Sequence, residues 1–224
     1  MCVIEEQQSA DPGVGDVASG ARQCVVLIHG IWLTGLELWP LARRLRAAGY
    51  AVRIFHYPSL RRSPAQNADA LQRWLAKIDL PVVHLIGYSL GGLVLLNLLA
   101  RHPAQRPGRL LLLGSPVHGN GVAARLARQR WSRPLLGRAL PGGLDGSAPR
   151  PAADRHIGVI AGDRPGGVGT LVGGLHGAND GTVSVAETRL PGAAHCVLPL
   201  GHIGLILSPR ALPAILAFLR SGKF

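Results

Sequence analysis

The sequence predicts an α/β fold, doubly wound, with a mostly parallel sheet of about six strands. Short apolar runs rich in β-branched residues alternate with segments in which apolar residues recur at helical spacing. Strands that alternate with helices form parallel sheets covered on both faces. The length of 224 residues suffices for one sizeable core, so we expect a single domain over 21–224 after a flexible tail over 1–20.

Each predicted strand is a short apolar run bounded by turn residues, as is typical of strands buried on both faces. In chain order the strands are expected at 24–28, 51–55, 82–86, 109–113, 157–161 and 195–198. Helical spacing predicts helices between them at 36–48, 65–78 and 90–101, and a last helix at 203–219. No internal repeat interrupts this alternation.

Composition excludes several classes of protein. The net charge of +12 comes almost wholly from arginine, because Lys77 and Lys223 are the only lysines. No basic run is interleaved with aromatic residues, which are 4% of the chain, so we expect no nucleic-acid partner. We interpret the charge as a coding bias, although a guanidinium-rich face would allow weak contact with an anionic membrane surface.

The start of the chain and its cysteines bear on its location. The first twenty residues lack the basic start and apolar stretch of a signal peptide, so we expect a cytoplasmic protein. The most apolar window, 80–100, contains glycines and polar residues that a strand, turn and helix explain better than a membrane span. Cys2, Cys24 and Cys196 have no paired spacing, so we expect reduced thiols and no zinc site.

The strongest chemical signal is the motif GYSLG over 87–91, directly after a predicted strand and before a predicted helix. This is G-x-S-x-G in the strand-turn-helix context in which a strained turn exposes a serine hydroxyl above the sheet. The small residues two positions on either side let strand and helix pass closely. We therefore interpret Ser89 as a nucleophile.

A serine hydroxyl needs a base to take its proton and a third group to orient that base. His202 lies four residues after the last predicted strand, where a loop would bring its imidazole over Ser89. His195 lies within that strand, and His156 and His176 precede the preferred acid, which breaks the order serine, acid, histidine. His202 is the predicted base.

Two aspartates compete as the orienting acid. Asp180 lies in the segment NDGTV, where a tight turn can point a carboxylate at a neighbouring loop. Asp163 directly follows the predicted strand at 157–161, which is also a suitable position. We favour Asp180 and keep Asp163 as the rival.

Acyl transfer also needs hydrogen-bond donors for the developing oxyanion. A glycine turn after the first strand would expose the backbone N–H of Ile31, and the second donor would be the N–H of Leu90. We expect His29 to be a structural hydrogen-bonding residue of the first turn. This chemistry requires no metal and no organic cofactor.

The segments LIHGIW, HLIGYSLGG, LLLGSPVHGNG, NDGTV and GHIGL, in this order over about residues 23–219, resemble the α/β-hydrolase family. They are most similar to small bacterial lipases and esterases, in the branch with a G-[ST]-P-x-H-G segment after the fourth strand. The resemblance implies a minimal α/β-hydrolase fold, an apolar ester as substrate, an oxyanion hole of Ile31 and Leu90, and a triad of Ser89, Asp180 and His202.

The segment 117–155, rich in Gly, Pro and Arg, has one amphipathic piece over 122–140. One interpretation is a short lid over the strand ends, in which four apolar residues face an acyl chain: Leu126, Trp131, Leu135 and Leu136. The other is an ordinary surface helix with a solvated arginine face. The sequence leaves both open.

The predicted function is cleavage of carboxylic esters with apolar acyl chains through an acyl-enzyme, as in a lipase or carboxylesterase. A thioesterase, a lipid deacylase or an acyltransferase would use the same residues. A non-catalytic protein of this fold that binds a lipid or a partner is the alternative from another class, and an intact serine, acid and histidine argue against it. Oligomeric state, head group and chain length stay open.

Overall fold

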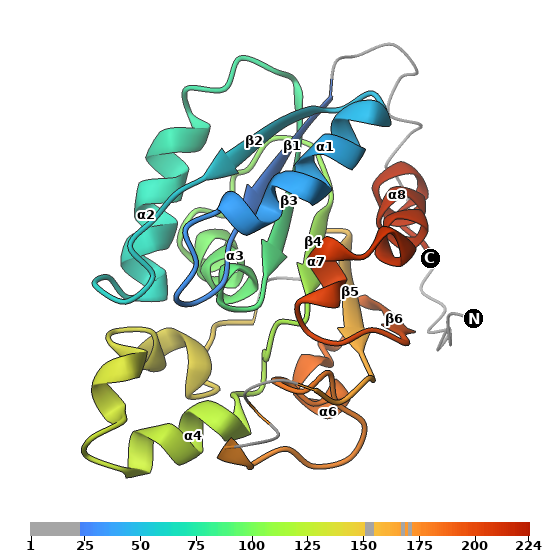
Figure 1. Ribbon diagram of the computed structural model, residues 1–224. Coiled ribbons are helices and arrows are strands. Elements are labelled where there is room, and N and C mark those ends of the chain that lie inside the picture. Colours follow the sequence, from blue (N-terminus) through green and yellow to red (C-terminus); the bar gives the residue numbers. More distant parts are fainter. Residues whose placement is uncertain (1–22, 151–154, 167–168, 170–171) are drawn as a thin grey trace.

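The computed structural model describes residues 23–150, 155–166, 169 and 172–224. Its centre is a fully parallel six-stranded sheet with the order β2-β1-β3-β4-β5-β6 (Figure 1). The predicted α/β class is confirmed, and each predicted strand end lies within two residues of the observed one. The strands are β1 (Gln23–Ile28), β2 (Ala51–Phe55), β3 (Val82–Tyr88), β4 (Leu110–Leu113), β5 (Ile157–Gly162) and β6 (Ala194–Leu198).

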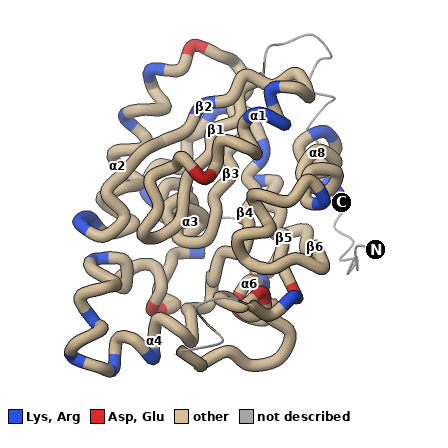
Figure 2. The backbone as a smooth tube through the Cα atoms, in the orientation of Figure 1, with Lys and Arg blue, Asp and Glu red and all other residues tan. Residues whose placement is uncertain are grey.

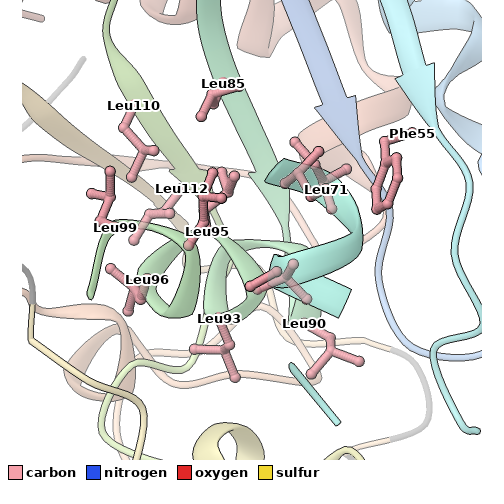
Figure 3. Packing of buried hydrophobic residues seen from close by; sticks show 14 of the residues in the cluster. Phe55, Leu71, Leu85, Leu90, Leu93, Leu95, Leu96, Leu99, Leu110 and Leu112 are labelled. Carbon is pink, nitrogen blue, oxygen red and sulfur yellow. The ribbon is translucent and has the colours of Figure 1, made fainter. Parts of the chain in front are cut away.

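Helices cover both faces of the sheet. On one face α2 (Pro64–Leu75) and α3 (Leu90–Arg101) pack against alternate strand residues, and Figure 3 shows the leucines of α3 against β3 and β4. On the other face lie α1 (Trp39–Ala47), which follows a 3₁₀ turn at Leu36–Leu38, and α8 (Leu212–Ser221). Side chains alternate between faces along a strand, so each strand contributes to both hydrophobic clusters.

Local sequence sets the helix ends. Helix α2 begins at a capping box, in which the Ser63 hydroxyl accepts from the N–H of Gln66 and Pro64 occupies the first turn. The prediction of one helix over 203–219 is wrong, because Ser208 is extended and Pro209 lacks an N–H. The chain forms α7 (Gly204–Leu207), a 3₁₀ turn at Pro209–Ala211 and then α8.

Residues 117–150, which we call the cap, connect β4 to the segment before β5. The predicted amphipathic piece over 122–140 is broken into α4 (Gly121–Arg128), a 3₁₀ turn at Arg133–Leu136 and an irregular turn at Leu140–Leu144. Prolines at 134 and 141 and the left-handed Gly137 interrupt the helix. The expected tail over 1–20 and residues 151–154 of the segment 117–155 lie outside the described residues.

The apolar window over 80–100 consists of β3, the turn at Ser89 and α3, as expected. Among the described residues, no helix has both the length and the apolarity needed to cross a membrane. A short helix that was not predicted, α6 (Val185–Thr188), follows the NDGTV segment and begins at a capping box of Ser184 and Glu187.

The cysteines differ from expectation at one position. Cys24 is buried in β1 as a free thiol, as predicted. Cys196, in β6, is disulfide-bonded, so the expectation of reduced thiols throughout is wrong. An odd count without paired spacing argues against a framework of several bridges, but it does not exclude one bridge between residues far apart in sequence.

Candidate active site

Ser89 occupies the sharp turn between β3 and α3, with φ 53° and ψ −120°. The backbone passes so closely here that the two motif glycines admit no side chain. A Cβ on Gly87 would lie 2.5 Å from the N of Gly92, and one on Gly91 would lie 2.3 Å from the carbonyl oxygen of Ile28. The motif therefore holds Ser89 in a strained conformation between two crossing elements.

The turn lies at the switch point of the sheet. Strand β1 is flanked by β2 on one side and β3 on the other, so the connections that leave β1 and β3 diverge and open a crevice. In the loop after β1, a Cβ on Gly30 would lie 3.2 Å from the Cβ of Ser89. Ile31 follows in the same loop and lines the pocket that Ser89 also lines.

Helix α3 starts at Leu90, directly after Ser89. The first N–H groups of a helix have no acceptor within the helix, and the helix dipole makes this end positive. An anion next to Ser89 would therefore meet a favourable field and the backbone donor of Leu90. The structure thus brings both predicted donor residues, Ile31 and Leu90, next to the serine turn.

Asp180 and His202 are in direct contact. The imidazole Nδ1–H of His202 donates to Asp180 Oδ2 at 2.6 Å, and the His202 backbone N–H donates to the Asp180 carbonyl at 2.9 Å. The other carboxylate oxygen accepts from the backbone N–H groups of Thr182 at 2.9 Å and Val183 at 2.8 Å. Because Asp180 is 1% exposed and held by these backbone donors, the network fixes the orientation of the imidazole.

Two further residues pack against His202, and sequence reasoning did not single them out. The ring centroid of Tyr88 lies 4.9 Å from that of His202, and burial raises the pKa of Tyr88 well above its ordinary value. A Cβ on Gly114, whose φ is 56°, would lie 3.0 Å from both Nδ1 and Cε1 of His202. The only signals in the sequence are a tyrosine before the motif serine and a glycine after β4.

The rival residues lie in other surroundings. Asp163 has an exposed side chain, and His195 in β6 is hydrogen-bonded to the Thr188 hydroxyl at 3.0 Å. His29 stacks on Tyr57 with ring centroids 4.2 Å apart, and its Nε2 accepts from the Tyr57 backbone N–H at 3.4 Å. Burial lowers the pKa of His29, which suits the structural role expected for it.

Ser89 and His202 line one pocket of about 600 Å³, and the cap forms its apolar wall. Of the four apolar residues expected to face inward, Leu126 and Leu136 line the pocket, whereas Trp131 and Leu135 are 75% and 48% exposed. The cap residues of the wall are Asn120, Val122, Ala123, Leu126, Leu136 and Leu144.

Helix α4 combines the two interpretations left open by the sequence. Its inner face lines the pocket, and its outer face carries exposed arginines, which Figure 2 shows along the cap. The cap is tied to the rest of the site, because Trp32 Nε1 donates to the Leu135 carbonyl at 2.6 Å and the Arg138 N–H donates to the Leu60 carbonyl at 2.9 Å.

A parallel sheet covered by helices, with a strained serine turn after its third strand, defines the class of protein. The chain belongs to the α/β-hydrolase fold family, whose model matches residues 23–166. The matched region includes the serine turn and the whole of the cap.

Curated relatives match in part. A pimeloyl-[acyl-carrier protein] methyl ester esterase from Aromatoleum aromaticum is 34% identical over 136 residues, which cover 59% of this chain and 52% of that protein. A protein of the same name from Aeromonas salmonicida is 32% identical over 112 residues, covering 48% of this chain and 41% of that protein. The chain therefore spans about half, or less, of the length of these relatives.

Solved structures are similar over nearly the whole chain. The Bacillus licheniformis lipase BlEst2 in mature form has a TM-score of 0.71 and 20% identity, with 94% of this chain and 96% of that chain covered. The Bacillus subtilis carboxylesterase CesB has a TM-score of 0.57 and 14% identity, with 92% and 86% covered. At these identities the likeness establishes the fold.

Proposed function

We propose that the protein hydrolyses carboxylic esters with apolar acyl chains through an acyl-enzyme formed on Ser89. One observation carries the proposal. A serine in a strained turn after β3 shares a pocket with an imidazole whose Nδ1 contacts a buried, anchored carboxylate. Esterases among the relatives support the same reaction class.

In the first half of the reaction, His202 Nε2 takes the proton of the Ser89 hydroxyl as its oxygen attacks the ester carbonyl. The negative charge that develops on the carbonyl oxygen is held by the N–H groups of Ile31 and Leu90, each contributing about 3 kcal/mol. Asp180 fixes the imidazole orientation and stabilises its protonated form. His202 then gives the proton to the departing alcohol.

In the second half, His202 activates a water molecule that attacks the acyl-enzyme, releasing the acid and restoring Ser89. No step in this sequence needs a metal or an organic cofactor. The apolar cap wall beside Ser89, formed in part by Leu126, Leu136 and Leu144, would receive the acyl chain.

The test is hydrolysis of nitrophenyl esters, from acetate to palmitate, by the wild-type protein beside Ser89→Ala. We expect turnover to fall by at least about 10³-fold in the variant while the circular dichroism spectrum is unchanged. The preferred chain length then separates an esterase from a lipase. Turnover that persists in Ser89→Ala, or that is missing with every ester, would overturn the proposal.

A further inference from the structure

Arg164 differs from the other arginines of this chain in its position. It is the second residue after β5, and its backbone N–H donates to the Leu200 carbonyl at 3.2 Å, in the segment that leads to His202. Among the residues that line the pocket, Arg164 is the one with a permanently charged side chain. Within the part of the chain that the structure describes, its guanidinium has no hydrogen bond or ion pair.

Arg164 borders the part of the pocket in which the alcohol portion of the ester would lie. In the proposed reaction His202 gives its proton to the departing alcohol, so the alcohol portion of the ester lies on the His202 side. Arg164, Gly201 and Ile203 border the pocket on that side, whereas the apolar wall for the acyl chain belongs to the cap.

The cap, which forms one wall of the pocket, has an excess of positive charge. The cap carries six arginines against a single acidic residue, Asp145. An excess of one sign of charge around a concave site raises the local concentration of ligands of the opposite sign. Arg164 is exposed and borders this pocket, and its unpaired guanidinium offers five donors in a planar fork, which matches the oxygens of a carboxylate or a phosphate.

We propose that Arg164 binds an anionic group, a carboxylate or a phosphate, on the alcohol portion of the ester. The inference rests on the proposed ester hydrolysis and extends it to the class of substrate. Arg164 is then the residue that sets preference for the leaving group, while the cap sets preference for the acyl chain. A neutral alcohol would leave the guanidinium without a partner and gain nothing from it.

The test compares esters that share one short acyl chain. Hexanoyl glycerol is matched with hexanoyl glycerol phosphate, and the hexanoyl ester of ethylene glycol with that of glycolate. We expect the wild-type protein to show a KM about tenfold lower for each anionic ester than for its neutral partner, with the difference shrinking in high salt. A preference for the phosphate pair alone, or the carboxylate pair alone, identifies which anion is bound.

Variants separate Arg164 from the general charge of the molecule. Arg164→Gln should raise the KM for the anionic esters about tenfold relative to the KM for their neutral partners, which removes the preference, and Arg164→Lys should restore part of it. Arg133→Gln, an exposed cap arginine away from the pocket, makes the same change in net charge and should keep the preference. Equal KM values for both members of each pair in the wild type, or an equal rise for both in Arg164→Gln, would overturn the inference.

A binding measurement keeps this result separate from the proposed hydrolysis. Ser89→Ala protein is titrated calorimetrically with hexanoyl glycerol phosphate, with and without the additional change Arg164→Gln. Binding about tenfold weaker in the double variant supports the role of Arg164 even if no ester is turned over. Equal affinity of the two proteins for hexanoyl glycerol phosphate and, in a second titration, for the hexanoyl ester of glycolate contradicts the role of Arg164 even if hydrolysis occurs.

Discussion

His202 is held on three sides by groups that fix one orientation of its imidazole. Asp180 binds Nδ1, the Tyr88 ring packs against one face, and the backbone at Gly114 leaves no space for a side chain. A misplacement of a reacting group by about 1 Å can cost about 10²-fold in rate. Activity should therefore depend on the glycine as much as on the polar partners.

We predict that Gly114→Ala lowers kcat by about 10²-fold, because the added methyl group displaces the His202 ring. Gly49→Ala is the matched control, since Gly49 also has a positive φ, of 96°, but open space around its Cα. Both variants should lose about 1 kcal/mol of stability from the left-handed backbone. Kinetics and urea unfolding of the two proteins measure the effects, and equal activity in both would contradict the prediction.

Substitution of the two candidate acids should have different effects on activity. Asp180→Asn should lower kcat by about 10⁴-fold, because an amide at this position stabilises the wrong imidazole tautomer. Asp163→Asn, on an exposed side chain, should retain wild-type activity. Ester hydrolysis by the two variants decides between them, and the reverse result would assign the role to Asp163.

A buried histidine away from the site gives a pH-dependent stability. Burial, reinforced by Arg109 and Arg155, lowers the pKa of His84 to about 4. Its Nδ1 accepts from the Arg109 N–H at 3.0 Å, and its Nε2 lies 2.9 Å from the Gln23 side-chain oxygen. Because the unfolded imidazole titrates near about pH 6.5, the unfolded state binds the proton first as pH falls.

We predict that the stability contributed by neutral His84 is complete above about pH 6.5 and is lost as pH falls toward about 4. The free energy of unfolding should fall by about 2 kcal/mol on this account between about pH 7.5 and about pH 5. His84→Gln removes the titrating group, so its free energy of unfolding should fall less over the same interval. Urea unfolding of both proteins at the two pH values measures this. An equal decline in wild type and variant would show that His84 does not cause it.

At the scale of the elements, the sequence sufficed for the sheet and less so for the cap. Strands could be predicted because six buried apolar runs have no competing pattern. Helical spacing alone could not reveal the breaks at Ser208 or within 122–140, where proline and glycine override an apolar periodicity. The same limit explains why one of the two open interpretations, the lid, had Trp131 and Leu135 facing inward.

The residues of the candidate site were predictable where a short motif determines the local backbone conformation, and less predictable where they lie in loops. Ser89 follows from five consecutive residues and their flanking elements. The choice between Asp180 and Asp163 depends on how two loops fold toward His202, which no local pattern encodes. Arg164 was missed because one arginine among many has no distinguishing sequence context.

Helix α4 should control which acyl chains fit. Val122 lines the pocket and is 5% exposed, whereas Ala124 on the same helix is exposed to solvent. We predict that Val122→Phe shifts the preferred ester to shorter chains, at a cost of about 1–3 kcal/mol in stability from overpacking. Ala124→Phe is the control and should keep the wild-type profile over the nitrophenyl ester series. An unchanged profile in Val122→Phe would exclude α4 from the acyl wall.

At the scale of the whole molecule, two hydrophobic clusters share one sheet. Val25 and Val26, for example, are neighbours in β1 and belong to opposite clusters. Because the same strands contribute side chains to both clusters, a loss of packing in one cluster disturbs the strands that support the other. The cap adds Leu136 and Leu144 to the cluster that contains α2 and α3. The described residues should accordingly behave as one cooperative unit.

We predict a single unfolding transition in urea, with midpoints that coincide for far-ultraviolet circular dichroism and tryptophan fluorescence. Circular dichroism reports the helices of the whole domain, whereas the fluorescence comes from tryptophans that include Trp74, packed against the α2–α3 cluster, and Trp131 on the cap. An earlier fluorescence midpoint, restored to coincidence by Trp131→Phe, would show that the cap unfolds on its own.

The cap is one continuous stretch of chain between β4 and β5, whereas Ser89 precedes it and Asp180 and His202 follow it. The part of the gene that encodes the cap is therefore separate from the parts that encode the residues proposed to react. Replacement of this one segment would change the wall of the pocket that receives the acyl chain, while the residues proposed to react, on either side of it in the sequence, stay the same.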